Sequence, residues 1–132
     1  MTANRFNFKL WDKRNKKIID NMSYGPKTFL TIDGKIVFID PIDCNMSYEN
    51  QDDYVIMQST GLIDRNGKEI FEGDIIKDDL LNEKYQVLYV EESSCFSLKE
   101  MRTSTFYDLH DYEVACNEVI GNIYENPELL KN

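Results

Sequence analysis

The sequence predicts a mainly β protein with little helix. Apolar residues alternate with polar residues over short runs, which is the period of a strand with one buried face. Asp-Gly and Asn-Gly pairs follow several of these runs, and such pairs form tight hairpin turns. Aromatic residues make up 12% of the chain, and they favour the half-buried surface of a sheet.

Two hairpins are expected in the first third of the chain. Residues 5–11 alternate in the manner of a strand, and residues 17–19 follow a polar turn as its return strand. Asp33-Gly34 separates residues 28–32 from residues 35–39, both rich in β-branched or aromatic side chains. Residues 43–53 are polar and acidic, and we expect a loop or linker there.

A second group of strands is expected after residue 54. Tight turns are predicted at Asn66-Gly67 and Gly73-Asp74, and a hairpin is predicted from residues 85–90 and 95–98. The last strand covers residues 118–124 and contains Gly121, a residue typical of a bulge or sharp bend. Residues 127–130 begin with proline and predict one helical turn. Residues 78–84 are expected to be a loop, and residues 107–118 either a short helix or an irregular connection.

The charge and hydropathy of the chain bear on its partners. The formal net charge is −9, from 24 acidic and 15 basic residues, which argues against direct nucleic-acid binding and against docking on an anionic membrane. No apolar run approaches the ~20 residues of a membrane helix, and the first residues lack the apolar core of a signal peptide. A soluble protein of a bacterial cytoplasm is therefore expected.

Few residues suggest chemistry. His110 is the single histidine and lies between carboxylates, but it has no matched partner in the sequence. Cys44, Cys95 and Cys116 are widely spaced and form no metal or disulfide pattern; Cys95 and Cys116 are expected to be small core residues. The paired acidic residues are expected in solvated loops. We therefore predict no enzyme activity, no cofactor and no metal.

Three stretches resemble the YopX-like family of small phage and prophage proteins. Residues 6–13 begin with an aromatic run ending in Trp11-Asp12, residues 57–77 resemble the pattern M-Q-x-T-G-L-x-D-x-N-G-x-E-I-Y-E-G-D-I, and residues 118–130 form a similar tail. Phe71 replaces the commoner tyrosine. The resemblance implies a mainly β protein with a carboxy-terminal SH3-like small barrel and a tendency to oligomerise, but it implies no catalytic residues.

These expectations give two subdomains and an order of hypotheses. Residues 1–56 should form an amino-terminal β-hairpin subdomain and linker, and residues 57–132 a small SH3-like β-barrel. The favoured function is a non-enzymatic binding or assembly protein of phage origin that forms a homo-oligomer. The alternative is an acidic phage effector that occupies a host protein's nucleic-acid site or sequesters a small ligand. A divergent hydrolase is the third hypothesis.

The oligomer contact is expected at the first strand. Phe6 and Phe8 lie on one face of that strand and Trp11 on the other. A strand that is apolar on both faces can be buried within the subunit or between subunits, and tryptophan is favoured at interfaces. Phe6, Phe8 and Trp11 are therefore the candidate contact residues.

Overall fold

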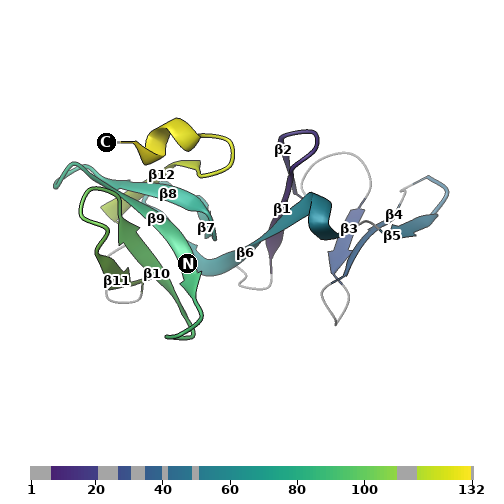
Figure 1. Cartoon of the computed structure of the whole chain (residues 1–132). Helices are drawn as coiled ribbons and strands as arrows, with labels where there is room; N and C mark the ends of the chain where they lie inside the picture. Colours follow the sequence, from purple (N-terminus) through teal and green to yellow (C-terminus); the bar gives the residue numbers. More distant parts are fainter. Residues whose placement is uncertain are drawn as a thin grey trace. The chain divides into compact units, whose positions relative to one another are not determined.

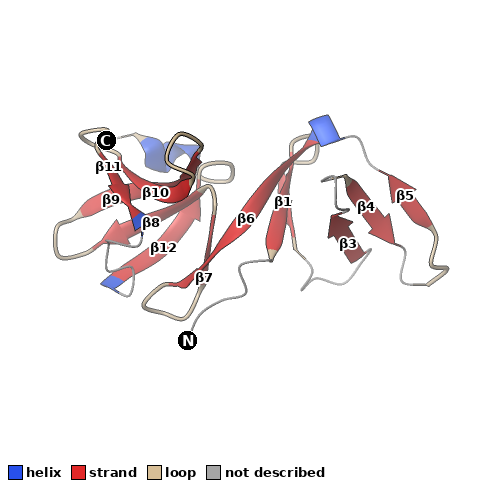
Figure 2. Cartoon of the chain, turned by 90° about the horizontal axis from the view of Figure 1, so that it is seen from below, coloured by secondary structure: helices blue, strands red, loops and turns tan. Residues whose placement is uncertain are grey.

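The computed structural model describes residues 7–20, 27–30, 35–39, 42–48, 51–109 and 116–131. Strands form most of the regular structure in these ranges, and short 3-10 turns make up the helical part (Figures 1 and 2). The prediction of a mainly β protein is confirmed. The chain divides into two compact units, one of Phe8–Ile56 and one of Met57–Asn132 with Met1–Asn7.

The amino-terminal unit contains the two predicted hairpins. Strand β1 (Phe8–Asp12) pairs antiparallel with β2 (Lys17–Ile19), so that Trp11 lies opposite Ile18. Strand β3 (Lys27–Leu30) pairs with β4 (Ile36–Ile39), and Asp33-Gly34 between them lies outside the described residues. Leu10 is fully buried, and Ile36 and Val37 are almost so.

The expected loop at residues 43–53 is wrong in part. Strand β5 (Met46–Tyr48) pairs antiparallel with β4 and completes a sheet in the order β3-β4-β5. A 3-10 turn, η1 (Gln51–Asp53), follows it and leads into β6 (Tyr54–Ile63). The Met-Ser-Tyr strand has weak local signals, and its pairing with β4 is what makes it a strand.

The carboxy-terminal unit is built around a five-stranded antiparallel sheet. The later residues of β6 pair with β7 (Glu69–Phe71). The sheet has the order β11-β10-β9-β8-β12 and is visibly curled (Figure 1). Its strands are β8 (Asp74–Asp78), β9 (Glu83–Val90), β10 (Cys95–Glu100), β11 (Phe106–Asp108) and β12 (Asn117–Asn122). The closer likeness to an SH3 barrel stays a prediction.

One face of this sheet supplies the core of the unit. Alternation along β9 and its register with β10 place Tyr85, Val87 and Leu98 on the same face. They form a buried cluster with side chains from neighbouring elements: Ile70, Ile76, Leu109 and Val119. The hairpin of β9 and β10 predicted from the sequence is therefore correct, and it carries the centre of the core.

The predicted turns occur where the sequence placed them. Gly67 has φ +81° and Gly73 has φ +91°, a conformation that glycine adopts without the clash of a Cβ atom. The register of β12 against β8 shifts between Val119 and Gly121, which is the expected bulge. The single helical turn at the carboxy terminus is the 3-10 turn η4 (Pro127–Leu130). Within the described ranges, no helix has the length and apolar character needed to cross a membrane.

Candidate interaction site

Asp64 illustrates how the buried carboxylates of this chain are used. Its side chain is 4% exposed and accepts main-chain hydrogen bonds from Asn66 (2.8 Å), Lys68 (2.8 Å) and Val119 (2.9 Å). The first two bonds close the turn between β6 and β7, and the third ties that turn to β12. The Asp64 side chain therefore fixes the turn that contains Asn66-Gly67.

Other buried aspartates have the same role. Asp74 Oδ2 accepts a 2.8 Å hydrogen bond from the main-chain N–H of Phe71. Asp78 Oδ1 accepts bonds from the N–H groups of Leu80 and Leu81 in the β8–β9 turn. Asp12 accepts bonds from Arg14 and Asn15 in the β1–β2 turn. Carboxylates that accept main-chain hydrogen bonds in this way fix the turns beside them.

Glu72 differs from these aspartates. Burial raises the pKa of the Glu72 carboxyl above its ordinary value, and a hydrogen bond from the main chain of Gln58 opposes that rise. Burial also raises the pKa of Tyr124, and the charge of Glu72 adds to that effect. The tyrosine ring packs against Gly73, since a Cβ atom there would lie 2.9 Å from Tyr124 Cε2. Glu72 and Tyr124 therefore lie close enough for the charge of one to influence the other.

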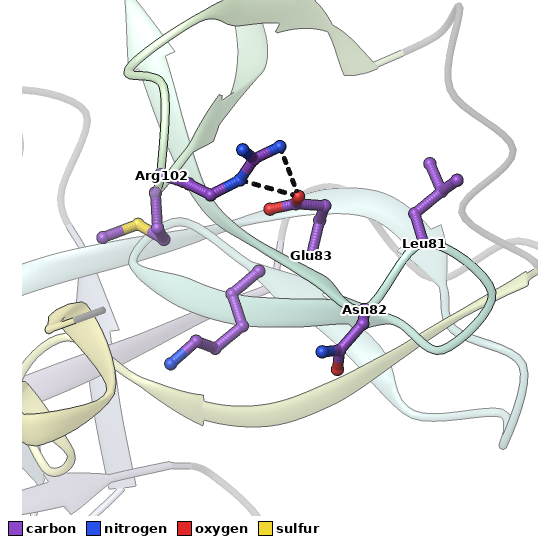
Figure 3. A pocket seen from close by; sticks show the side chains of 6 residues that line it. Leu81, Asn82, Glu83 and Arg102 are labelled. Atoms are coloured by element: carbon purple, nitrogen blue, oxygen red, sulfur yellow. Dashed lines mark hydrogen bonds and ion pairs between the residues drawn. The ribbon is translucent and has the colours of Figure 1, made fainter.

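A surface hollow of 380 Å³ lies beside the β8–β9 turn. Its wall includes Glu83, Lys84 and Arg102, together with the apolar side chains of Leu81 and Met101 (Figure 3). Arg102 Nε donates to Glu83 Oε1 at 2.9 Å, as the dashed lines in Figure 3 show. Lys84 Nζ donates to the main-chain oxygen of Leu129 at 3.0 Å. Both cations of the hollow already have partners, so it offers no prepared anion site.

The structure describes some of the residues that suggested chemistry. His110 lies outside the described residues. Cys44 and Cys116 are exposed and Cys95 is half-buried, so the expectation that Cys95 and Cys116 fill the core is wrong. Cys116 lies directly before β12, outside the strand, and its side chain is exposed. Among the described residues, no group of three His, Cys, Asp or Glu side chains could hold a metal ion.

Exposed aromatic side chains lie on β11, at the edge of the five-stranded sheet, and on the central strand β9. Strand β11 is its terminal strand, and all three of its residues are exposed. Phe106 is 55% exposed and Tyr107 is 42% exposed. Tyr89 on β9 is 43% exposed and packs edge-to-face against Phe96 of β10. The sequence analysis missed this edge because β11 fell in a stretch expected to be helical or irregular.

The predicted contact residues lie on the first strand. Phe6 is outside the described residues. Phe8 and Trp11 are both half-buried in β1, on opposite faces, with the fully buried Leu10 between them. Both aromatic side chains are therefore partly exposed to solvent.

These features define a small mainly β protein whose distinctive groups are turns, core residues and exposed aromatic edges. The chain belongs to the YopX protein family, which it matches over residues 7–131. It is similar to the crystal structure of protein EF1440 from Enterococcus faecalis, with 29% identity and a TM-score of 0.63 over 95% of this chain and 97% of that one. It is also similar to the X-ray structure of protein yopX from Bacillus subtilis, with 20% identity and a TM-score of 0.66 over 97% of this chain and 100% of that one. No curated protein matches the chain.

Proposed function

We propose that this protein is a non-enzymatic binding and assembly protein, of phage origin and acting in the host cytoplasm, that associates with copies of itself. The observation that carries the proposal is the aromatic edge at β11. A terminal strand offers main-chain hydrogen-bonding groups to another strand, and proteins that stay monomeric usually protect such edges with charges, proline or bulges. Here Phe106 and Tyr107 occupy two of the three positions of the strand.

The exposed side chains suit an interface. Aromatic residues contribute large contact areas at low conformational cost and are enriched at protein–protein contacts. Tyr107 is held in place, because its hydroxyl donates to Glu100 Oε2 at 3.3 Å and its ring packs edge-to-face against Tyr85. A side chain that is already ordered loses little entropy on binding. Phe8 and Trp11 on β1 are the second contact surface of the proposal, with Phe6 beside them in sequence.

Sedimentation velocity of the full chain at micromolar concentration tests the proposal. We expect the wild-type protein to sediment as a homo-oligomer. Phe106→Lys should shift it toward monomer without lowering its melting temperature, because the side chain is exposed and a lysine blocks edge pairing. Leu80→Lys is the matched control, since Leu80 is 89% exposed but lies in the β8–β9 turn.

The strand β1 contact has its own variant. Trp11→Glu should weaken assembly while most of the far-ultraviolet circular dichroism of the chain persists, because the sheet in residues 57–132 should stay folded. A wild-type protein that is monomeric over the whole micromolar range would reject self-association altogether.

A second candidate function is favoured by the distribution of charge. Residues 57–132 contain sixteen acidic and seven basic side chains, and such a surface suits the nucleic-acid site of a host protein. Capture of a DNA-binding host protein that competing duplex DNA releases would support this effector function. Persistence of the captured protein after the competitor is added would reject it.

A further inference from the structure

The two edges of the five-stranded sheet differ in how their main-chain groups are used. At the β12 edge, Asn117 O accepts from Arg65 N at 3.0 Å, and Val119 N donates to Asp64 Oδ2 at 2.9 Å. The bulge between Val119 and Gly121 also interrupts this strand, and a bulge protects an edge from pairing. Strand β11, beside β10 at the other edge (Figure 1), has no strand on its outer side among the described residues. In this part of the chain, the sheet therefore has one edge that is open to another strand.

The hairpin of β10 and β11 determines which main-chain groups of β11 point away from the sheet. Glu100 N donates to Thr105 O at 2.8 Å, so Thr105 faces β10. Residues of an antiparallel strand alternate between those that bond to the neighbouring strand and those that face away from it. Tyr107 therefore faces β10 as Thr105 does. Phe106 and Asp108 direct their N–H and C=O groups outward, toward the open side of the edge.

This pattern limits how the edge can pair with a copy of itself. Around a two-fold axis, an outward-facing residue lies opposite another outward-facing residue. An axis at Asp108 would place two carboxylates opposite each other, which is destabilising. An axis at Phe106 gives about two main-chain hydrogen bonds, because Ser104 has φ +59° and leaves the extended conformation. An axis at Tyr107 pairs Phe106 with Asp108 of the second copy twice and gives about four bonds.

The charges of the edge are complementary in the arrangement with the axis at Tyr107. Lys99 of β10 lies directly opposite Phe106 in the hairpin, and it makes no ion pair with any residue that the structure describes. Asp108 of the second copy would lie on the other side of Phe106, on the same face of the sheet as Lys99. Each copy then places a cation near a carboxylate of the other. The occupant that this charge pattern fits is a second copy.

We infer that β11 of one copy pairs antiparallel with β11 of a second copy about a two-fold axis at Tyr107. The inference rests on the self-association proposed above and specifies its contact at this edge. Pairing of this kind joins two sheets into one, and it is a closed contact because the same surface serves both copies. The two Tyr107 side chains meet at a position without main-chain hydrogen bonds, where Cα atoms are about 4.5 Å apart and aromatic side chains contact each other.

Disulfide cross-linking of the full chain tests the position of the axis. The native cysteines Cys44, Cys95 and Cys116 are first replaced by serine. In that background, Tyr107→Cys should form a covalent dimer under copper–phenanthroline oxidation, because the expected Cα separation of about 4.5 Å lies in the range of a disulfide. Leu80→Cys is the matched control, since Leu80 is 89% exposed but lies in the β8–β9 turn. It should give about tenfold less dimer.

A second pair of variants keeps the tyrosine in place. Phe106→Cys and Asp108→Cys, mixed in equal amounts in the same background, should cross-link to each other, because these positions lie opposite each other at a Cα separation of about 5.5 Å. Each variant alone should give about as little dimer as Leu80→Cys. Efficient cross-linking of Phe106→Cys with itself would place the axis at Phe106 and overturn the inference.

Sedimentation of the wild-type chain separates the inference from the proposal on which it rests. A wild-type oligomer whose Tyr107→Cys variant and Phe106→Cys/Asp108→Cys mixture both cross-link no better than Leu80→Cys would overturn the inference alone. A monomeric wild type would overturn self-association and this contact together. Cross-linking of Tyr107→Cys to a host protein in a lysate, without a dimer of the chain, would assign the edge to a different partner.

Discussion

Replacing Asp64 by alanine should destabilise the carboxy-terminal unit more than any ordinary surface change. The substitution removes the acceptor of three main-chain N–H groups. The N–H of Val119 is buried between the turn and β12, and leaving such a donor unsatisfied costs about 1–3 kcal/mol. The N–H groups of Asn66 and Lys68 belong to exposed residues and can bind water, so each should lose about 0.5–1.5 kcal/mol.

The expected total is about 3–4 kcal/mol in the free energy of unfolding, which corresponds to a fall in melting temperature of roughly 12–32 °C for a unit of this size. Urea unfolding followed by far-ultraviolet circular dichroism measures it. Asp64→Asn keeps one side-chain oxygen as an acceptor but places an amide group, which is a donor, where the second oxygen was. We expect it to lower the free energy of unfolding about half as much as Asp64→Ala.

The control for Asp64 is Asp79, which pairs with Arg65, the residue that follows Asp64 in the chain. The side chain of Asp79 is 44% exposed and pairs with Arg65 and Lys77. An exposed ion pair contributes at most about 1 kcal/mol, so Asp79→Ala should change stability little. If Asp64→Ala lies within 1 kcal/mol of the wild type, or matches Asp79→Ala, the structural role given to the Asp64 carboxylate is refuted.

Three further predictions concern single positions. Gly73→Ala should cost about 2 kcal/mol or more, because φ +91° disfavours a Cβ atom that would also press on Tyr124; an unchanged urea midpoint would contradict this. Lys16→Gly should raise stability by up to ~1 kcal/mol through relief of the left-handed φ, and a lower melting temperature would refute it. The folded protein raises the pKa of Glu72 above its unfolded-state value. The contribution of Glu72 to the free energy of unfolding is therefore most favourable below the unfolded-state pKa and is lost as the pH rises through the folded-state pKa. Glu72→Gln should therefore be more stable than the wild type at neutral pH, and thermal melts should show the advantage vanishing in acid below the ordinary glutamate pKa.

Much of the fold was predictable because strong local signals agree with the tertiary structure. The alternating run at residues 85–90 became β9, and its partner β10 followed a turn whose residues the sequence marked clearly. Strands β5 and β11 were not predicted, because each has three residues and depends on pairing with a neighbouring strand. No local pattern specifies such pairing. The predicted burial of Cys116 was wrong because this residue lies outside β12, and the sequence did not show where that strand begins.

The candidate site was predictable to a smaller extent. The aromatic residues Phe8 and Trp11 were identified from alternation, and the structure places them on opposite faces of β1 as expected. The aromatic edge at β11 was missed together with the strand. The uneven charge could have been counted from the sequence, but the total of −9 concealed it.

Self-association is the central claim of this account, and the sedimentation of the wild-type chain tests it most directly. The protein should sediment as a defined oligomer at micromolar concentration in ~0.15 M salt, where the Debye length is about 8 Å and the repulsion between chains of net charge −9 is partly screened. A monomer at every concentration and salt would contradict the claim.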